Sequence, residues 1–284
     1  VEAVLMRRAG YECRVLPEEC GSYEDNPPTL LEFTRRDLRW CQGNMQYWAL
    51  LGLKNLQPMS RFQLLWAIMM FIGVPAFTLM IGLAVLKPLD GEDMARFPVV
   101  SALGLYAVWL AMYLAPKLAG FIDIALTRGG LARYGGGTRF AAGALFELGF
   151  SFLLGAATTL RTGLFMLGLL FGRSVIWGGQ SRDAHELSYA TAFAGLWPQF
   201  IFGAYLYGMA AWLAPSLILW SAPLTLGYFF AIPFAVETSR PRFTRFLQRT
   251  GLCAIPEDLA QPPVLALLEQ VAASTSSPTM MEHA

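Results

Sequence analysis

Two arginines and a tryptophan near the start of the chain have a spacing that suits a phosphorylated sugar. In the stretch RRDLRW, residues 35–40, Arg36, Arg39 and Trp40 stand at positions i, i+3 and i+4, which are neighbours on one surface of a helix. Guanidinium groups bind phosphate oxygens through paired hydrogen bonds, and a flat indole beside them offers a platform for a sugar ring. The spacing alone favours another interpretation, a solvated basic face or a contact with lipid headgroups, with Trp40 in an interfacial aromatic belt.

Two charged residues interrupt otherwise apolar runs. Glu147 lies in the run 140–160 and Arg173 in the run 162–179. A charge at the centre of a span costs roughly 2.5–3.5 kcal/mol on insertion scales. We expect Glu147 and Arg173 to form an intramembrane ion pair, and a role of one of them in lining a watery channel is compatible with that pair.

No metal site is expected in this chain. His185 and His283 have no ligand-like companions. The cysteines fit no zinc or redox motif and are expected to be free thiols in a reducing compartment; they are Cys13, Cys20, Cys41 and Cys253.

The element that must position the arginines is a helix. Asn26 is expected to cap its N-terminus with Pro27 at the first helical position, so the helix is predicted over Pro27–Gly43. Before it, VEAVLMRRAG predicts a helix that ends at Gly10, followed by a short strand over Tyr11–Leu16. A helix followed by a strand suggests the edge of an α/β fold.

The rest of the chain has the composition of a membrane protein. Hydrophobic residues make up 55% and charged residues 14%, where a soluble domain has about 25% charged; the mean hydropathy is +0.46. Nucleic acid is not a suggested partner. Residues 1–63 form a cytoplasmic part, residues 64–236 a membrane region and residues 237–284 a cytoplasmic tail that is expected to be disordered after 250. Apolar runs predict six spans, at about 64–86, 97–116, 140–160, 162–179, 192–215 and 216–236.

The basic residues support this count. With residues 1–63 in the cytoplasm, six spans leave only Lys87, Arg96 and Arg161 on the outer side, out of 21 Lys and Arg residues. Basic residues near span ends accumulate on the cytoplasmic side. The N-terminal segment and the tail are therefore both predicted to be cytoplasmic.

The sequence resembles processive family-2 glycosyltransferases. RRDLRWCQGN is similar to the Gln-x-x-Arg-Trp motif of cellulose and hyaluronan synthases, and VEAVLMRRAGY with GSYEDNPPTLLEFTRRDLRWCQGN resembles the bacterial glucosyltransferases of osmoregulated periplasmic glucan biosynthesis. The resemblance implies a multi-pass protein of the bacterial inner membrane that begins with the C-terminal edge of a GT-A-type catalytic domain. It would elongate a β-glucan from UDP-glucose with inversion and pass the growing chain across the membrane.

The resemblance also implies roles for residues. Arg39 would contact the donor's diphosphate and Trp40 would stack beneath the acceptor sugar. Arg36 stands where cellulose synthases have Gln, so it would reinforce phosphate binding while an acceptor-contacting amide is absent. The general base and the divalent cation, Mg or Mn, would belong to a catalytic domain upstream of Val1. This chain alone is therefore predicted to be an inactive C-terminal fragment.

A loop later in the chain occupies the place of the gating loop of cellulose synthases. By that analogy Trp177, Gln180, Arg182 and Asp183 would insert toward the donor, with Gly178 and Gly179 as a hinge. A plain polar connector explains the loop equally well.

A function from another class also fits the composition. As the alternative, the chain is a small-molecule transporter or channel whose first sixty residues are a cytoplasmic arm. Replacement of Trp40 by alanine separates the two, because it should abolish polymer synthesis and leave transport intact.

Overall fold

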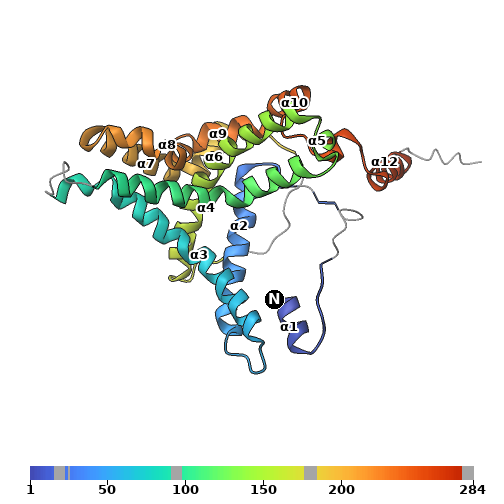
Figure 1. The fold of residues 1–284 in the computed structure, drawn as a ribbon, viewed down its shortest axis with the longest axis horizontal. Coiled ribbons are helices and arrows are strands. Elements are labelled where there is room, and N and C mark those ends of the chain that lie inside the picture. The colour runs from blue at the N-terminus through green and yellow to red at the C-terminus, as the bar shows by residue number, and fades with distance from the viewer. Residues whose placement is uncertain (16–22, 25, 91–97, 176–183, 277–284) are drawn as a thin grey trace, which may run out of the picture. The chain divides into compact units, whose positions relative to one another are not determined.

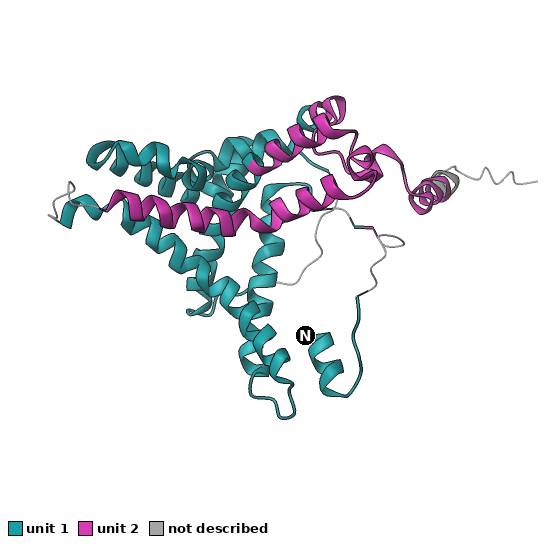
Figure 2. Ribbon diagram, viewed as in Figure 1, with its two compact units in different colours: residues 1–18, 24–97, 149–244 teal, residues 19–23, 98–148, 245–284 magenta. Residues whose placement is uncertain are grey.

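The fold is built from helices, and no strand occurs in the part of the chain that the computed structural model describes (Figure 1). The chain divides into two compact units, residues 1–18, 24–97 and 149–244 in the first and residues 19–23, 98–148 and 245–284 in the second (Figure 2). Helix α6 belongs to both. The described residues are 1–15, 23–24, 26–90, 98–175 and 184–276.

The first unit contains most of the longer helices. Two short 3-10 helices, η1 (Gln46–Leu50) and η2 (Lys87–Asp90), flank α3. The α-helices of this unit are α1 (Glu2–Arg8), α2 (Leu30–Met45), α3 (Pro58–Ala84), α7 (Tyr189–Leu213), α8 (Ser216–Phe229) and α9 (Ala231–Ser239), together with the later part of α6 (Gly137–Leu169) and the start of α10 (Pro241–Thr250).

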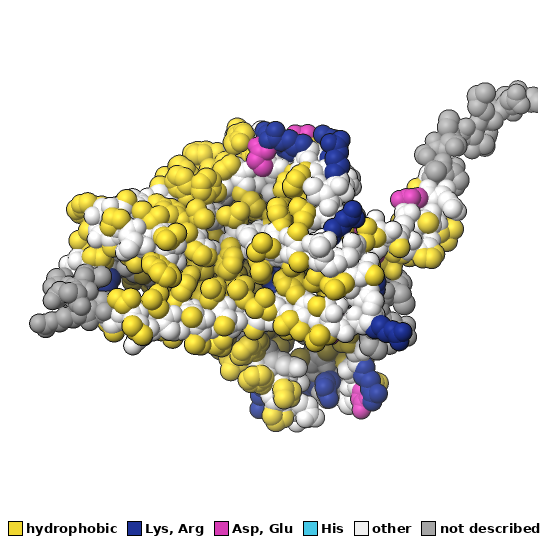
Figure 3. Space-filling view, turned by 45° about the horizontal axis from the view of Figure 1, so that its top comes forward, with side chains coloured by type: hydrophobic (Ala, Val, Ile, Leu, Met, Phe, Trp, Pro, Cys, Tyr) yellow, Lys and Arg dark blue, Asp and Glu magenta, His cyan; other side chains and the backbone are white. Residues whose placement is uncertain are grey.

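The second unit consists of α4 (Val99–Leu126), α5 (Gly130–Arg133), the first turns of α6, the end of α10, α11 (Pro256–Leu259) and α12 (Pro263–Ser276). No residue of α4 is buried, although the helix is apolar along its length. Figure 3 shows that hydrophobic side chains cover much of the visible surface. Exposed apolar surface of this extent is typical of contact with lipid.

Helix α6 corrects the predicted span pattern. Sequence analysis placed two spans at 140–160 and 162–179, but residues Gly137–Leu169 form one helix of 33 residues. No proline or glycine stands at residues 160–162 to end it. The helix ends where Gly172 adopts φ 81° and the Arg173 and Gly172 amides donate to the Gly168 and Leu169 carbonyls, the bonding pattern of a Schellman cap. The separate span at 162–179 is wrong.

Three helices are long and apolar enough to cross a membrane: α3, α4 and α6. The pair α8 and α9 passes the same test as one span with a bend of 59°, so the described residues contain three or four candidates rather than six. Pro233 accounts for the bend, because it lacks the amide that would bond to the Phe229 carbonyl. Helix α7 spans 25 residues without a charged side chain, but its Trp, Tyr, Pro and Gln residues lower its hydropathy.

The termini differ from expectation in two places. Residues 11–15 of the predicted strand Tyr11–Leu16 form no strand, and Leu16 lies outside the described residues; a strand requires a second strand to bond with, and the described residues supply none. The tail is not disordered throughout, because α12 continues to Ser276. Pro263 begins α12, a favoured first position, and apolar residues recur along it.

The core of the first unit brings the later helices together. One buried cluster joins α2 to α7 and α9 through Leu30, Leu196 and Val236. A second joins α3, α6, α7 and α8, with Tyr228 fully buried at its centre. These clusters fix where α2, the helix with the predicted binding residues, meets α6 and α7.

Candidate functional site

Helix α2 begins three residues later than predicted. Its N-cap is Thr29, whose hydroxyl accepts a hydrogen bond from the Glu32 amide at 3.3 Å. Pro27 precedes Pro28, and a residue before proline is pushed out of the helical region. Asn26 therefore does not cap the helix. Its side-chain oxygen accepts instead from Arg36 Nη1 at 3.3 Å.

Arg36 and Trp40 lie together on α2, as the spacing predicted. The Arg36 guanidinium carbon is 4.8 Å from the centroids of both the Phe33 and the Trp40 rings, within the range of cation–π attraction. The Trp40 side chain is 55% exposed, so one face of its indole remains open to a ligand. Arg39 is half-buried on the same helix.

A half-buried carboxyl and a buried thiol lie on the helix beside this stack. Burial raises the pKa of the Asp37 carboxyl to about 6, although the charge of Arg36 opposes the shift. Cys41 is fully buried, and burial raises the pKa of its thiol to about 11. Cys13, Cys41 and Cys253 are free thiols, while Cys20 lies outside the described residues.

The opposite side of α2 borders a cavity of about 1140 Å³ in the first unit. Three arginines line it: Arg35 from α2, Arg161 from α6 and Arg173 from the segment after α6. Arg36, Arg39 and Trp40 are not among its lining residues. The remaining wall comes mainly from α6 and α7, including Leu160, Leu164, Phe165, Trp197, Gln199, Ile201, Phe202 and Tyr205.

A reciprocal pair of hydrogen bonds holds α6 against α7 at the cavity wall. Arg161 Nη1 donates to the Gly195 carbonyl at 2.5 Å, and Gln199 Nε2 donates to the Ala157 carbonyl at 3.0 Å. In each helix, the residue whose side chain donates and the residue whose carbonyl accepts lie one turn apart. The two bonds therefore fix the antiparallel register of α6 and α7. Gly195 allows a close approach to α2, because a Cβ atom there would lie 2.7 Å from a methyl of Leu31 and the leucine would have to shift.

The sequence did not single out Arg35, Arg161 or Gln199 as site residues. Arg161 was placed in a loop between two spans, and it lies instead inside α6. A guanidinium within an apolar helix was the available signal, since charged residues in such segments usually face a partner or a cavity.

The predicted ion pair of Glu147 and Arg173 is wrong. Glu147 pairs with Lys117 of α4 within the second unit. Glu147 and the end of α6 at Leu169 are 22 residues apart on one continuous helix, or about 33 Å at 1.5 Å per residue. Arg173 follows that end, so the two charges cannot meet.

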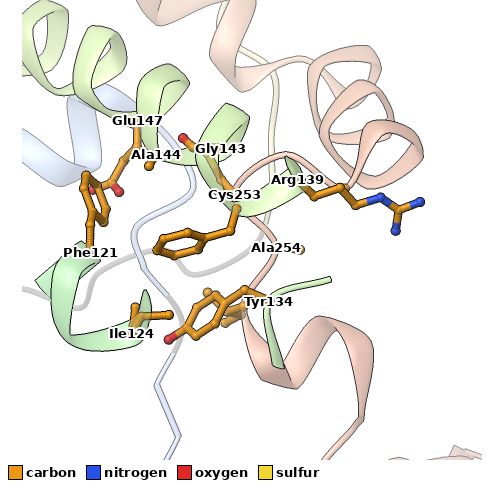
Figure 4. Close-up of a pocket in the computed structure, with 12 residues that line it drawn as sticks. Phe121, Ile124, Tyr134, Arg139, Gly143, Ala144, Glu147, Cys253 and Ala254 are labelled. Carbon is orange, nitrogen blue, oxygen red and sulfur yellow. The ribbon is translucent and has the colours of Figure 1, made fainter. Parts of the chain in front are cut away.

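Glu147 also borders a small pocket of about 350 Å³ in the second unit. Figure 4 shows aromatic side chains of Phe121 and Tyr134 around it and the Arg139 guanidinium pointing away from it. Cys253 Sγ donates to the Gly143 carbonyl at 3.5 Å. The pocket walls are mostly apolar, and the sequence did not predict a binding site there.

The predicted gating residues Trp177, Gln180, Arg182 and Asp183 lie outside the described residues, as do Gly178 and Gly179. Within the described part of the chain, no three His, Cys, Asp or Glu side chains gather closely enough to hold a metal ion.

Comparison with protein families gives one match. Residues 3–120 match the family described as glycosyl transferase family group 2. This range contains most of α1 and all of α2 and α3, and with them the Arg36–Trp40 stack. No solved structure matches the chain.

Comparison with curated proteins gives relatives with one shared name, glucans biosynthesis glucosyltransferase H. The protein from Xanthomonas euvesicatoria pv. vesicatoria (strain 85-10) is 31% identical over 280 residues, which are 93% of this chain and 43% of that protein. The protein from Pseudomonas entomophila (strain L48) is 29% identical over 285 residues, 95% of this chain and 33% of that protein. The chain spans less than half the length of these curated relatives.

Proposed function

From the similarity of nearly the whole chain to glucosyltransferase H proteins, we propose that it forms part of a membrane glucosyltransferase. The donor is UDP-glucose and the acceptor is a growing β-glucan. The enzyme inverts the anomeric centre and passes the glucan across the bacterial inner membrane, where it becomes an osmoregulated periplasmic glucan.

The observation that carries the proposal is the stack of Arg36 on Phe33 and Trp40 within the matched residues 3–120. A guanidinium that lies over aromatic rings keeps its N–H edge clear of them, so it can still donate to phosphate oxygens. The exposed indole of Trp40 provides a flat apolar surface. In the proposal, Arg36 and Arg39 hold the diphosphate and Trp40 supports the acceptor sugar.

Support for the membrane part comes from α3, α4 and α6, which have the length and apolar character of spans. The stack lies on α2, and η1 joins α2 to α3, the first long apolar helix, along the chain. This order suits an enzyme that extends a polymer at a membrane surface. The predicted gating residues Trp177, Gln180, Arg182 and Asp183 keep their proposed role of closing over the donor.

The test uses the full-length protein in membrane vesicles with radiolabelled UDP-glucose. Trp40→Ala is expected to lower glucan formation at least tenfold, about 1.4 kcal/mol in the activation barrier, because the acceptor loses its platform. Trp48→Ala is the matched control, since Trp48 is 52% exposed in η1 and is not part of the stack. Equal glucan formation by both variants contradicts the proposed role of Trp40.

A second variant separates binding from folding. Arg36→Lys keeps the charge but loses the planar fork, so we expect a higher KM for UDP-glucose with the protein level in the vesicles unchanged. An unaltered KM contradicts the assignment of Arg36 to the diphosphate.

A further inference from the structure

Among the described residues, the arginines that line the cavity between α2, α6 and α7 outnumber the carboxylates that pair with them. Arg35 pairs with Glu32 at 2.5 Å, whereas Arg161 bonds to the uncharged Gly195 carbonyl. No carboxylate among the described residues forms an ion pair with Arg161 or Arg173. The charges of Arg35 and Arg173 also act on the Arg161 guanidinium. Like charges gathered around one cavity repel one another, and a bound anion would relieve that repulsion.

The rest of the cavity wall is mostly apolar and open to the exterior. Trp197 and Ile201 of α7 line it and are 50% and 55% exposed. Tyr205 lines it too. Its hydroxyl donates to the Gly82 carbonyl at 2.8 Å, so the aromatic ring is the part of Tyr205 that can contact a ligand in the cavity. The ligand must therefore tolerate an apolar wall as well as supply an anion.

Polar and apolar parts are separated along α7. Arg161 meets α7 at Gly195, while Ile201 and Tyr205 follow six and ten residues later, about 9–15 Å along the helix axis. One end of the cavity is thus cationic and the other is aliphatic and aromatic. This is the order of groups in a phospholipid, with its phosphate at one end and its acyl chains at the other.

We infer that the cavity binds an anionic phospholipid of the surrounding membrane. The phosphate lies at Arg161 and Arg173, and an acyl chain lies along Trp197, Ile201 and Tyr205. The volume of about 1140 Å³ slightly exceeds the usual range of small-molecule pockets, roughly 300–1,000 Å³. Basic pockets between membrane helices bind acidic lipid headgroups. A soluble phosphate compound would leave the exposed apolar wall uncovered.

Arg173 gives the clearest test of this site. Its side chain is exposed, and its backbone amide, which caps α6 through the Gly168 carbonyl, remains after substitution. Arg173→Gln therefore removes a charge without removing a structural contact. Arg128→Gln is the matched control, because Arg128 is also exposed and does not line the cavity.

The experiment measures binding to the purified full-length protein in a non-ionic detergent by native mass spectrometry. Dioctanoyl phosphatidylglycerol is the anionic probe, and dioctanoyl phosphatidylcholine has the same chains with a zwitterionic headgroup. We expect the anionic lipid to bind more tightly, and Arg173→Gln to weaken it roughly tenfold, the effect of one charge-assisted hydrogen bond. Arg128→Gln should leave the affinity unchanged.

Ile201→Ala tests the apolar end of the cavity. It should weaken the binding of dioctanoyl phosphatidylglycerol and leave the binding of inorganic phosphate unchanged, because the phosphate ion does not reach Ile201.

Four results overturn the inference. The first two are equal affinity for the two lipids and equal affinity of Arg173→Gln and Arg128→Gln for the anionic lipid. The other two are displacement of the anionic lipid by inorganic phosphate or UDP at matched concentration, and its displacement by a soluble gluco-oligosaccharide. The last two identify a soluble substrate in the cavity. The outcome is independent of the Trp40 experiment, because the two sites share no residue.

Discussion

A methyl group added to Gly203 tests the packing that holds the first unit together. A Cβ atom at Gly203 would lie 2.5 Å from the Phe229 amide nitrogen and 2.7 Å from its Cα. Ordinary contacts of a Cβ begin at 3.4 Å, so α7 and the α8–α9 junction would have to separate by about 1 Å. Backbone atoms cannot turn aside as a side chain does, and overpacking of this kind costs about 1–3 kcal/mol, occasionally more.

Gly208 provides the control on the same helix. No atom lies within 4 Å of a Cβ placed there, so Gly208→Ala adds only helix propensity, worth up to about 1 kcal/mol. The two substitutions are chemically identical and should shift stability in opposite directions, with a difference of about 2–4 kcal/mol.

Thermal unfolding of the full-length protein in detergent, followed by tryptophan fluorescence, measures this difference. At about 2–4 °C per kcal/mol for a domain of 150–250 residues, Gly203→Ala should have a lower midpoint than Gly208→Ala by at least about 4 °C. Equal midpoints refute the close approach of α7 to the α8–α9 junction, and with it the position of the cavity wall.

Three further predictions concern titration, thiol reactivity and the ion pair. Asp37→Asn should stabilise the protein at pH 7 by up to about 3 kcal/mol before solvent screening reduces the value; because burial raises the pKa of Asp37 to about 6 from 3.8, the gain should vanish below pH 4, and urea unfolding at both pH values checks it. A thiol reagent at pH 7.5 should modify exposed Cys13 and leave buried Cys41 unmodified until the protein unfolds, which peptide mass spectrometry detects; modification of Cys41 in the folded protein contradicts its burial. Glu147→Gln should destabilise the protein by leaving Lys117 unpaired, and a double-mutant cycle with Lys117→Met should give a coupling energy above about 0.5 kcal/mol; additive effects contradict the pair.

Apolar runs in the sequence located α3 and α4 because hydropathy depends only on local composition. The same reasoning divided α6 at Arg161, since a charge was taken as a break in the membrane. A helix ends where the backbone leaves the helical conformation. After α6 this happens at Gly172, which adopts the αL conformation. Inside α6 the Arg161 guanidinium is accommodated by the Gly195 carbonyl, 34 residues away, a partner that no local pattern contains.

The rotation of α2 could be predicted only in part. Spacing correctly placed Arg36 beside Trp40, because neighbours on a helix follow from its period. Which side of α2 faces α7 depends on Leu31 fitting against Gly195, and this contact turns Arg35 toward the cavity. The partner of Glu147 was missed for a similar reason, since Lys117 comes from another helix.

The central claim is that Trp40 and its neighbouring arginine form the place where the sugar chain is extended. A structure of the full-length protein in a lipid nanodisc with UDP and a gluco-oligosaccharide tests it most directly. The account predicts a glucosyl ring stacked on the exposed face of the Trp40 indole, with the Arg36 guanidinium within hydrogen-bonding distance of the diphosphate. An oligosaccharide bound elsewhere, with that indole face against lipid or protein, would contradict the claim.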